Sequence, residues 1–336
     1  DAGTFTGLMA RLLQDPEIVR LERERVELDT GELLRSRYTT RALIRIEADM
    51  AEQAMRLAED RGFAVERAVI HSVFQRHGRL SDEQRSAIEW VTGRERIAAV
   101  VGRAGAGKTT MMTAAREVWE AAGYRVVGAA LAGKAAEGLE KEAGIESRTL
   151  SSWQLRWNKG RDLLDDRTVF VLDEAGMVSS RQMADFVAAV SAAGAKLVLV
   201  GDPEQLQPIE AGAAFRALAD RIGYVELENI YRQKQQWMRD ASLDLARGNV
   251  GDAITRYADQ GRVLGSPFKA DAVAALIADW NRDYDPAKTT LILAHLRRDV
   301  RELNVLVRGK LIERGLIEPG QAFRTEDGER HFAAGD

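Results

Sequence analysis

The chain has 336 residues, of which 45% are hydrophobic and 30% are charged, and its formal net charge is −4. This length suffices for two compact domains, each with its own hydrophobic core. The weak negative charge excludes a uniformly basic nucleic-acid-binding protein, so contact with nucleic acid is expected only in a local groove. The absence of cysteine excludes disulfides, thiolate zinc sites and cysteine nucleophiles.

The sequence also lacks the usual signals for membranes and metals. No apolar run reaches the roughly 18 residues that span a bilayer, and the first residues lack the layout of a signal peptide. We therefore expect no membrane insertion and a cytoplasmic location. The four histidines show no paired metal-binding spacing and are interpreted as ordinary surface or core residues: His71, His77, His295 and His331.

The first part of the chain has a helical pattern. Residues 8–60 are rich in leucine, arginine and glutamate and nearly free of glycine and proline. Apolar residues such as Leu8, Leu12 and Ile18, followed by Leu21 and Leu28, recur at helical spacing. We therefore predict an all-helical N-terminal domain over residues 1–78.

From Ile97 onward, short apolar runs alternate with helical segments that end at Gly123, Gly144 and Gly194. This alternation predicts an α/β fold, in which helices cover both faces of a parallel sheet. Such sheets bind ligands beyond the carboxyl ends of their strands. We place this domain at residues 79–232.

A second α/β unit is expected over residues 233–336. The pattern predicts helices within 235–260 and near 269–283, a strand at 289–295 (TTLILAH) and a further helix from Arg297. Only part of a domain is visible in this sequence, which reads as a piece of a longer protein.

Residues 102–109, GRAGAGKT, match the pattern G-x-x-x-x-G-K-[ST] between a predicted strand and a predicted helix. Glycines let backbone N–H groups approach phosphate oxygens at a helix N-terminus, where the helix dipole favours anions. Lys108 is expected to contact the β and γ phosphates, and the Thr109 hydroxyl to bind Mg²⁺. The predicted nucleotide-binding residues of this P-loop are Gly102, Gly105, Ala106, Gly107, Lys108, Thr109 and Thr110.

Two further strand ends carry polar residues. The apolar run TVFVL delivers Asp173 and Glu174 to the carboxyl edge, where Asp173 can hold Mg²⁺ through water and Glu174 can orient the attacking water as a general base. The run LVLVGDPEQLQP brings Gln205 to the same edge. Gln205 is a candidate sensor of the γ phosphate.

The combination of GRAGAGKT, DEAGM, GDPEQLQP and YRQ resembles superfamily 1 DNA helicases of the RecD-like branch, over roughly residues 80–310. The resemblance implies a RecA-like P-loop ATPase domain at 79–232, part of a second RecA-like domain at 233–336, and ATP with Mg²⁺ as ligands. It also implies single-stranded DNA as the track, with 5′ to 3′ polarity.

Further roles follow from this resemblance. Gln84, in RLSDEQRSAI, matches the glutamine that reads adenine in the family, although Ser81 and Gln84 also have the spacing of a helix capping box. Arg232, in NIYRQ, matches an arginine that completes the ATP site from the second domain; a surface arginine is the alternative.

The resemblance also identifies candidate DNA contacts. Gly133 and Lys134, in GAALAGKAAEGL, and Thr149 and Ser151, in RTLSSWQLRW, lie in segments that contact single-stranded DNA in the family. Trp153 and Trp157 are four residues apart on one helical face. We interpret them as core residues, and base-stacking platforms for DNA are the alternative.

The helical segment LERERVELDTGELLRSRYTTRALIRIEADM, followed by these motifs, resembles the helicase region of TraA-type conjugative relaxases. This implies partners in the conjugative relaxosome and among type IV secretion coupling proteins. The leading hypothesis is an ATP-hydrolysing helicase module. One alternative is a docking module with a helicase fold, for DNA or a coupling protein. Another is a P-loop kinase or other nucleotide enzyme that does not act on nucleic acid.

Overall fold

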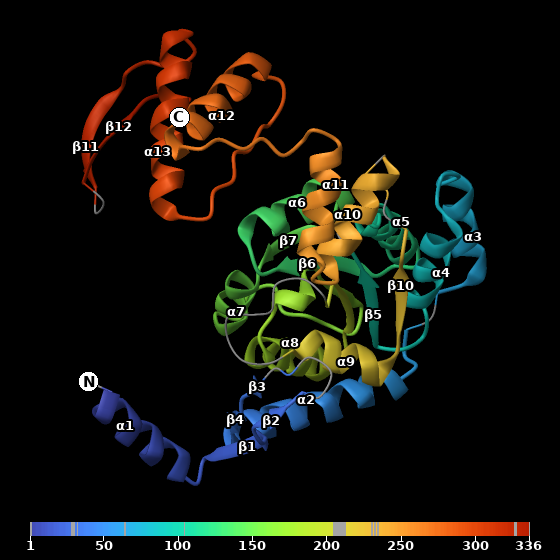
Figure 1. Ribbon diagram of the computed structural model, residues 1–336. Helices are drawn as coiled ribbons and strands as arrows, with labels where there is room; N and C mark the ends of the chain where they lie inside the picture. Colours follow the sequence, from blue (N-terminus) through green and yellow to red (C-terminus); the bar gives the residue numbers. More distant parts are fainter. Residues whose placement is uncertain are drawn as a thin grey trace. The chain divides into compact units, whose positions relative to one another are not determined.

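The computed structural model forms two compact units, Asp1–Gly248 and Asn249–Asp336 (Figure 1). The residues it describes are 2–27, 31, 33–63, 65–103, 105–203, 213–229, 231, 233, 235–325 and 328–335. None of the helices within these ranges has both the length and the apolar character needed to cross a membrane. The expected boundaries at residues 78 and 232 stay predictions.

The first unit is built around a six-stranded parallel sheet with the strand order β10-β5-β9-β8-β6-β7. The strands are β5 (Ile97–Gly102), β6 (Arg125–Ala130), β7 (Glu146–Thr149), β8 (Thr168–Leu172), β9 (Lys196–Gly201) and β10 (Tyr224–Leu227). Every residue of β5, β8 and β9 is buried. Continuous apolar runs of this kind are typical of parallel strands covered on both faces, and the predicted α/β class is confirmed.

Helices cover both faces of this sheet, and the side chains of β5 alternate between the two cores. Ile97, Ala99 and Val101 join one cluster, and Ala98 and Val100 join the other. The second cluster contains residues of α4 (Asp82–Val91), α5 (Lys108–Ala121) and α6 (Gly133–Ala143). The first contains residues of α7 (Leu150–Asn158), α8 (Ser180–Ala193) and α9 (Ala214–Ile222).

Two of the expected helix ends carry glycines in the left-handed conformation. Gly144 ends α6 with φ 70°, and Gly194 ends α8 with φ 65°. Glycine adopts this conformation without the steric cost of a Cβ, which is why it so often follows the last helical residue. The predicted ends at these positions are confirmed.

The tryptophans of α7 are core residues, as interpreted from their spacing. Trp153 is 1% exposed and donates its indole N–H to the Gly128 carbonyl oxygen at 2.8 Å. Trp157 packs against Phe170 and Phe186, with ring centroids 5.8 and 5.1 Å away. Trp153 is therefore closed to a nucleobase, and Trp157 is a partly buried residue at the edge of the same core.

The segment before residue 78 is helical only in part, so the expectation of an all-helical domain is corrected. It contains α1 (Ala2–Gln14), β1 (Ile18–Glu22), β2 (Arg25–Val26), β3 (Leu33–Leu34), β4 (Arg37–Thr40), α2 (Arg41–Glu59) and α3 (Arg67–Arg76). Strands β1 and β4 pair in antiparallel fashion, with Ile18 opposite Thr40. The β-branched residues at this ladder favour extended backbone, and they outweigh the helical spacing of the leucines.

Helix α2 packs on α8 and α9 at the surface of the sheet's first core (Figure 1). Its side chains Met50, Ala54 and Leu57 are buried in the cluster that contains Phe186. The Ser180 hydroxyl of α8 donates a hydrogen bond to the Glu47 carboxylate of α2 at 2.7 Å. This helix therefore extends the helical layer on this face of the sheet.

The second unit contains α11 (Val250–Asp259), α12 (Lys269–Asp283), α13 (Arg297–Glu313) and the antiparallel hairpin of β11 (Gln321–Thr325) and β12 (Gly328–Phe332). Helix α10 (Gln236–Ala246) belongs to the first unit. The helices confirm the pattern-based expectation, but residues 289–295 form no strand. A strand needs a hydrogen-bonded neighbour, and β11 and β12 pair with each other. A partial second RecA-like domain stays a prediction.

Candidate functional site

The loops that carry the sequence motifs meet at one edge of the sheet. Because all six strands are parallel, their carboxyl ends lie on the same side. The P-loop follows β5, Asp202 follows β9, and Asp173 follows β8, and these three strands are direct neighbours. The segments with the candidate DNA contacts follow β6 and end β7, at one side of the sheet. The strand order therefore places the candidate nucleotide-binding residues after β5, β9 and β8, and the candidate DNA contacts after β6 and β7 at one side of them.

The P-loop has the backbone geometry that its glycines allow. Gly105 and Gly107 adopt φ 85° and 80°, and Gly107 is the residue that precedes the first turn of α5. A Cβ at Gly102 would lie 3.2 Å from the Cβ of Leu227 and 3.3 Å from Cγ of Lys108. Gly105 and Gly107 are therefore needed for their left-handed backbone, and Gly102 is needed because its surroundings leave little room for a side chain.

The Lys108 ammonium donates hydrogen bonds to carbonyl oxygens of the loop itself. Its acceptors are Gly102, in a very short contact, and Arg103 at 3.2 Å. The Ala106 N–H also donates to the Arg103 carbonyl, at 3.1 Å. Binding a triphosphate here requires Lys108 to exchange these carbonyl oxygens for phosphate oxygens.

Asp173 and Glu174 lie within electrostatic reach of Lys108. Burial raises the pKa of Asp173, opposed by a hydrogen bond from the Glu174 N–H at 2.9 Å and by the charge of Lys108. Burial, with a smaller contribution from Asp173, also raises the pKa of Glu174, and Lys108 again opposes the change. The structure thus brings together three of the predicted ATP-site residues.

The backbone of Glu174 is strained. It adopts φ 53° and ψ 33°, a left-handed conformation that is uncommon for a residue with a side chain, directly before the short helix η1 (Ala175–Met177). Such strain costs roughly 1–3 kcal/mol and is concentrated at functional sites. The conformation turns the chain directly from the end of β8 into η1.

The turn at η1 packs directly on the end of β9. Gly176 touches the backbone of Asp202, and Gly201 touches the backbone of Gly176 and Ala175. Asp202 is itself 8% exposed. Sequence reasoning missed this close packing of Gly176, which stands two residues after Glu174 in the sequence. The contact places the turn after β8 directly against the end of β9.

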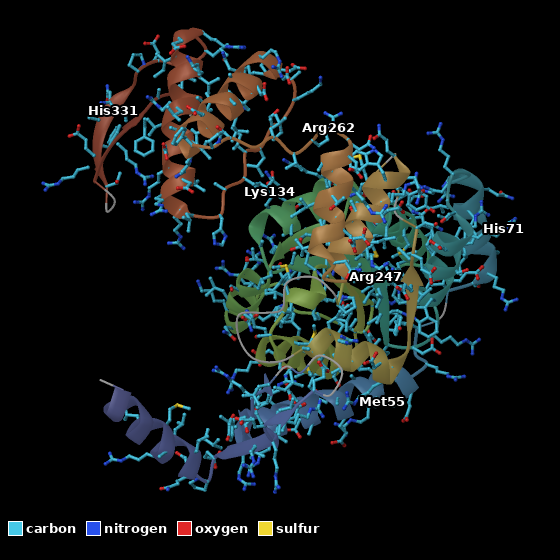
Figure 2. The ribbon with its side chains drawn as sticks, in the orientation of Figure 1. Met55, His71, Lys134, Arg247, Arg262 and His331 are labelled. Carbon is cyan, nitrogen blue, oxygen red and sulfur yellow. The ribbon has the colours of Figure 1, made fainter. Side chains whose placement is uncertain are left out.

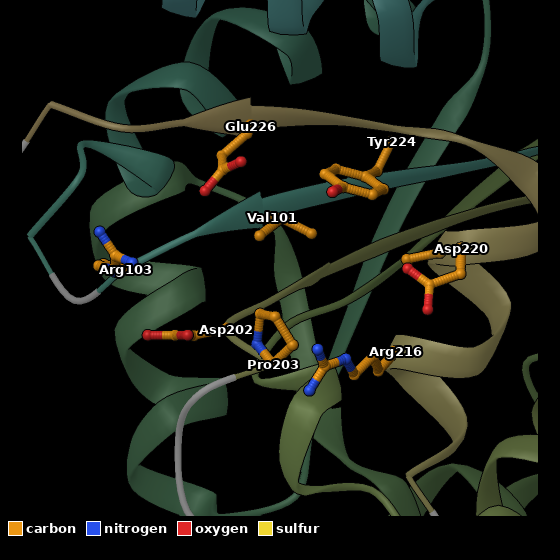
Figure 3. A pocket seen from close by; sticks show the side chains of 9 residues that line it. Val101, Arg103, Asp202, Pro203, Arg216, Asp220, Tyr224 and Glu226 are labelled. Carbon is orange, nitrogen blue, oxygen red and sulfur yellow. The ribbon is translucent and has the colours of Figure 1, made fainter. Parts of the chain in front are cut away.

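A small cavity opens beside the P-loop, between β10, the ends of β5 and β9, and α9 (Figure 3). Its volume of about 180 Å³ is below the range of pockets that enclose a drug-sized ligand. Its charged and polar lining comes from Arg103, Asp202, Arg216, Asp220, Tyr224 and Glu226. The cavity is too small for a nucleoside triphosphate, so the candidate nucleotide site is the open loop edge next to it.

Gln84 makes both contacts that its position suggested for a cap, and one more to the P-loop. Its Oε1 accepts from the Ser81 N–H at 3.1 Å, and its own N–H donates to the Ser81 hydroxyl at 3.2 Å, so the capping box is present. Its Nε2 donates to the Gly107 carbonyl oxygen at 3.1 Å. The side chain is 6% exposed. An adenine-reading role for Gln84 stays a prediction.

Two predicted site residues, Gln205 and Arg232, lie outside the described residues. Tyr231, next to Arg232 in the sequence, is described and lies at the P-loop. Its N–H donates to the Gly105 carbonyl oxygen at 2.8 Å, and its Cδ2 lies 3.4 Å from where a Cβ of Gly107 would be. Sequence reasoning did not identify this contact.

The candidate DNA contacts lie at two neighbouring helix N-termini. Helix α6 begins at Gly133 and α7 begins after Thr149, and the pairing of β6 with β7 brings these starts together. A Cβ at Gly133 would lie 3.9 Å from Cγ2 of Thr149. Lys134, labelled in Figure 2, is exposed, and Ser151 is exposed as well. Two helix N-termini and one lysine form a surface that favours phosphate groups.

The Thr149 hydroxyl is already engaged. It caps α7 by accepting a hydrogen bond from the Ser152 N–H at 3.3 Å. A hydroxyl that accepts this bond can still donate its proton to a phosphate oxygen. Gly133 and Thr149 are thus close neighbours, and a role of Gly133, Lys134, Thr149 and Ser151 in contacting DNA stays a prediction.

The donor set at the loop edge fits a magnesium-bound triphosphate. A left-handed glycine precedes the N-terminus of α5, Lys108 carries a positive charge, and Thr109 and Asp173 carry the oxygen atoms that would bind the metal. Oxygen is the ligand atom that Mg²⁺ prefers. The raised pKa of Asp173 has burial as its main cause, and a bound cation would favour the ionised form.

Comparisons with known proteins agree with this geometry. A family model described as "AAA domain" matches residues 79–267, more than half of the chain. The "Probable conjugal transfer protein TraA" of Sinorhizobium fredii (strain NBRC 101917 / NGR234) is 68% identical over all 336 residues, which span 30% of that protein.

A more distant relative is the "ATP-dependent RecD2 DNA helicase" of Deinococcus radiodurans. It is 32% identical over 225 residues, covering 65% of this chain and 30% of that protein. Among solved structures, a Pif1 helicase complex on forked double-stranded DNA aligns with 60% of this chain and 57% of that chain, at 23% identity and a TM-score of 0.40.

The chain spans about a third of the length of the curated relatives it matches. The match of the family model covers the sheet, the P-loop and both carboxylates of the site. The chain therefore belongs to the AAA domain family, as a helicase-like P-loop module similar to a region of TraA conjugal transfer proteins and to RecD-like helicases.

Proposed function

We propose that this chain is the ATP-hydrolysing motor module of a conjugative DNA-transfer protein and that it moves along single-stranded DNA in the 5′ to 3′ direction. The observation that carries the proposal is that all these residues lie at one edge of the sheet. The P-loop, Asp173 and Glu174 follow the carboxyl ends of β5 and β8, and the helix starts at Gly133 and Thr149 follow the ends of the next strands, β6 and β7. One rigid sheet thus carries both a phosphate-binding loop and a surface suited to a DNA backbone.

In the proposed reaction, the N-terminus of α5 and Lys108 bind the phosphates of ATP. Thr109 and Asp173 would hold Mg²⁺, which when bound neutralises phosphate charge. Glu174 orients the attacking water and accepts its proton, and burial suits it to this role because it raises the pKa of the carboxyl. Gln205 and Arg232 are proposed to contact the γ phosphate.

Movement along DNA needs a link between hydrolysis and DNA contact. The packing of Gly176 on the backbone of Asp202 ties the Glu174 turn to the loop after β9. Strand β8 in turn pairs with β6, whose end leads to Gly133 and Lys134. We propose that changes at the phosphates reach the DNA surface through these packed strand ends.

The experiment that tests the proposal is an ATPase assay with and without single-stranded DNA at low salt. The complete protein is expected to hydrolyse ATP faster when single-stranded DNA is present, and the Lys108→Ala variant to lose hydrolysis. ATP hydrolysis that single-stranded DNA does not stimulate would contradict the proposal.

The alternative of a docking module makes a different forecast. A module that serves only as a recognition surface for DNA or a secretion coupling protein needs no ATP chemistry, so Lys108→Ala would leave DNA transfer between cells unchanged. The motor proposal expects that variant to abolish transfer. Residence in the cytoplasm and partners in the conjugative relaxosome belong to the same proposal.

A further inference from the structure

The second half of the P-loop is held from outside by two separate elements. The Gly107 carbonyl oxygen accepts from Gln84 Nε2 of α4 at 3.1 Å, and the Gly105 carbonyl oxygen accepts from the Tyr231 N–H at 2.8 Å. The Gly107 carbonyl oxygen also accepts from the Met111 N–H of α5 at 3.1 Å, so the bond from Gln84 adds to the bond of the helix itself. The bonds from Gln84 and Tyr231 thus support Gly105 and Gly107 from outside the loop.

The two outside elements are tied to each other. The carboxylate of Glu83, in the first turn of α4, accepts from the Asn229 side-chain Nδ2 at 2.7 Å and from the Asn229 backbone N–H at 3.3 Å. Glu83 is next to Gln84 in the chain, and Asn229 is two residues before Tyr231. The contacts close a ring that runs from α4 to the P-loop, on to Tyr231, and back to α4 through Asn229.

These hydrogen bonds orient the backbone N–H groups of the P-loop that are proposed to contact phosphate. A peptide unit is planar, so fixing the direction of a carbonyl also fixes the N–H of the next residue. Holding the Gly107 carbonyl therefore orients the N–H of Lys108, at the start of α5, where the first N–H groups have no partner inside the helix. Glycine-rich loops lose much conformational entropy when they become ordered. Order imposed before ligand binding reduces that cost and raises affinity.

We propose that Glu83 and Asn229 are positioning residues for nucleotide binding, which rests on the proposed ATP-binding function. Their hydrogen bonds fix the segment after β10 against α4, which keeps the Tyr231 N–H on the Gly105 carbonyl. The second half of the P-loop is then ordered before ATP arrives. Neither side chain touches the nucleotide in this proposal; both act through Tyr231 and the loop.

The test measures ATP hydrolysis by the complete protein against ATP concentration, for Glu83→Ala, Asn229→Ala and the double variant. A hydrogen bond to a charged group contributes less where solvent reaches it, and these bonds are exposed. We therefore expect about a five-fold rise in KM for ATP, which corresponds to about 1 kcal/mol. The value of kcat is expected to stay nearly unchanged, and the affinity for an ATP analogue to fall in parallel.

The double variant separates a shared role from two independent ones. Because both residues act through the same contact, the double variant is expected to raise KM no further than the single variants do. Multiplied effects would overturn the proposal, as would an unchanged KM in both single variants. A fall in kcat at constant KM would also overturn it.

Asp82 provides the matched control. It lies in the same first turn of α4 as Glu83 and is exposed, and the described residues show no bond from it to Asn229. Asp82→Ala removes the same favourable charge at the helix start but leaves the bonds between Glu83 and Asn229 in place. Its KM for ATP is therefore expected to match that of the wild type. An equal rise of KM in Asp82→Ala would assign the effect to the helix dipole and overturn the proposal.

Two further variants make the outcome decisive. Asn229→Asp removes the amide donor and places a carboxylate against Glu83, so its KM is expected to rise at least as far as in Asn229→Ala; an unchanged KM would count against the proposal. Lys108→Ala tests the underlying function separately. If Lys108→Ala hydrolyses ATP normally, the proposed function is wrong. If it is inactive while the Glu83 and Asn229 variants behave as wild type, only the positioning role is wrong.

Discussion

Gly176 and Asp202 touch through their backbones: a Cβ built on Gly176 would lie 2.3 Å from the Asp202 carbonyl oxygen and 3.2 Å from its carbonyl carbon. Real side chains do not approach a backbone this closely. The contact joins the turn that carries Glu174 to the end of β9, and any side chain at residue 176 must push these two loops apart.

The first prediction concerns this contact. Gly176→Ala is expected to lower the free energy of unfolding by about 1–3 kcal/mol, the usual cost of overpacking, and to reduce ATP hydrolysis more than ATP binding. Chemical denaturation and ATPase assays would measure both. Gly138→Ala is the control, because a Cβ at Gly138 in α6 has no atom within 4 Å among the described residues. Equal stability of both variants would contradict the prediction.

The second prediction concerns Glu174 as the general base. Glu174→Gln keeps the shape of the side chain but cannot accept a proton, so kcat for ATP should fall about 100-fold or more, with ATP binding retained. Burial and Asp173 raise the pKa of Glu174. When the solution is acidified, Glu174 is therefore protonated at a higher pH than an ordinary glutamate is. The activity of the wild type is expected to begin to fall at this higher pH.

The variant supplies the control for that pH dependence. The residual activity of Glu174→Gln should lack the acidic limb of the pH profile, since the titrating base is gone. An unchanged acidic limb in the variant, or a kcat close to that of the wild type, would remove Glu174 from the role of base.

The third prediction concerns Lys196, which is fully buried at the start of β9. Its ammonium donates to the carbonyl oxygens of Gly93 and Glu95, each at 2.7 Å, and burial lowers its pKa from 10.5 to about 7. Between these values the unfolded chain binds more protons than the folded chain, so stability rises with pH. The slope from one such group is at most about 1.4 kcal/mol per pH unit.

Urea unfolding at several pH values between 7 and 10 would measure this effect. The free energy of unfolding of the wild type is expected to increase with pH relative to that of Lys196→Met, which cannot titrate. Below pH 7 the difference between the two should become constant. Parallel curves across the whole range would show that Lys196 keeps an ordinary pKa.

The fourth prediction concerns helix α2. Ser180 is fully buried and donates to Glu47 at 2.7 Å. Ser180→Ala leaves this carboxylate without its donor and should lower the free energy of unfolding by about 1–3 kcal/mol. Asp49→Ala, an exposed change on the same helix, should have little effect. Equal stability of the two variants would mean that α2 is not anchored through this bond.

The sequence was most informative where chemistry needs a fixed local spacing. The P-loop, the Asp173–Glu174 pair and the glycines that end α6 and α8 are each set by neighbouring residues, so they could be predicted. The strand order could not be, because it depends on which strands pair across long stretches of chain. Residues 18–40 and 289–295 were mispredicted for a related reason: extended backbone depends on a partner strand, which local spacing does not reveal.

Within the site, the missed contacts are also non-local. The bond between Tyr231 and Gly105 joins residues far apart in the sequence, and it uses a backbone N–H that every residue except proline has. The capping box at Ser81 and Gln84 was visible from spacing alone, but the additional bond to Gly107 was not. Loops at one sheet edge interact in ways that only the folded arrangement shows.

The measurement that tests the central claim most directly is ATP-dependent displacement of streptavidin from biotinylated single-stranded DNA by the complete protein. Movement from 5′ to 3′ predicts faster displacement from a 3′ biotin than from a 5′ biotin, and no acceleration with Lys108→Ala. No ATP-dependent displacement at either end would contradict the motor, and faster displacement from the 5′ biotin would contradict its direction.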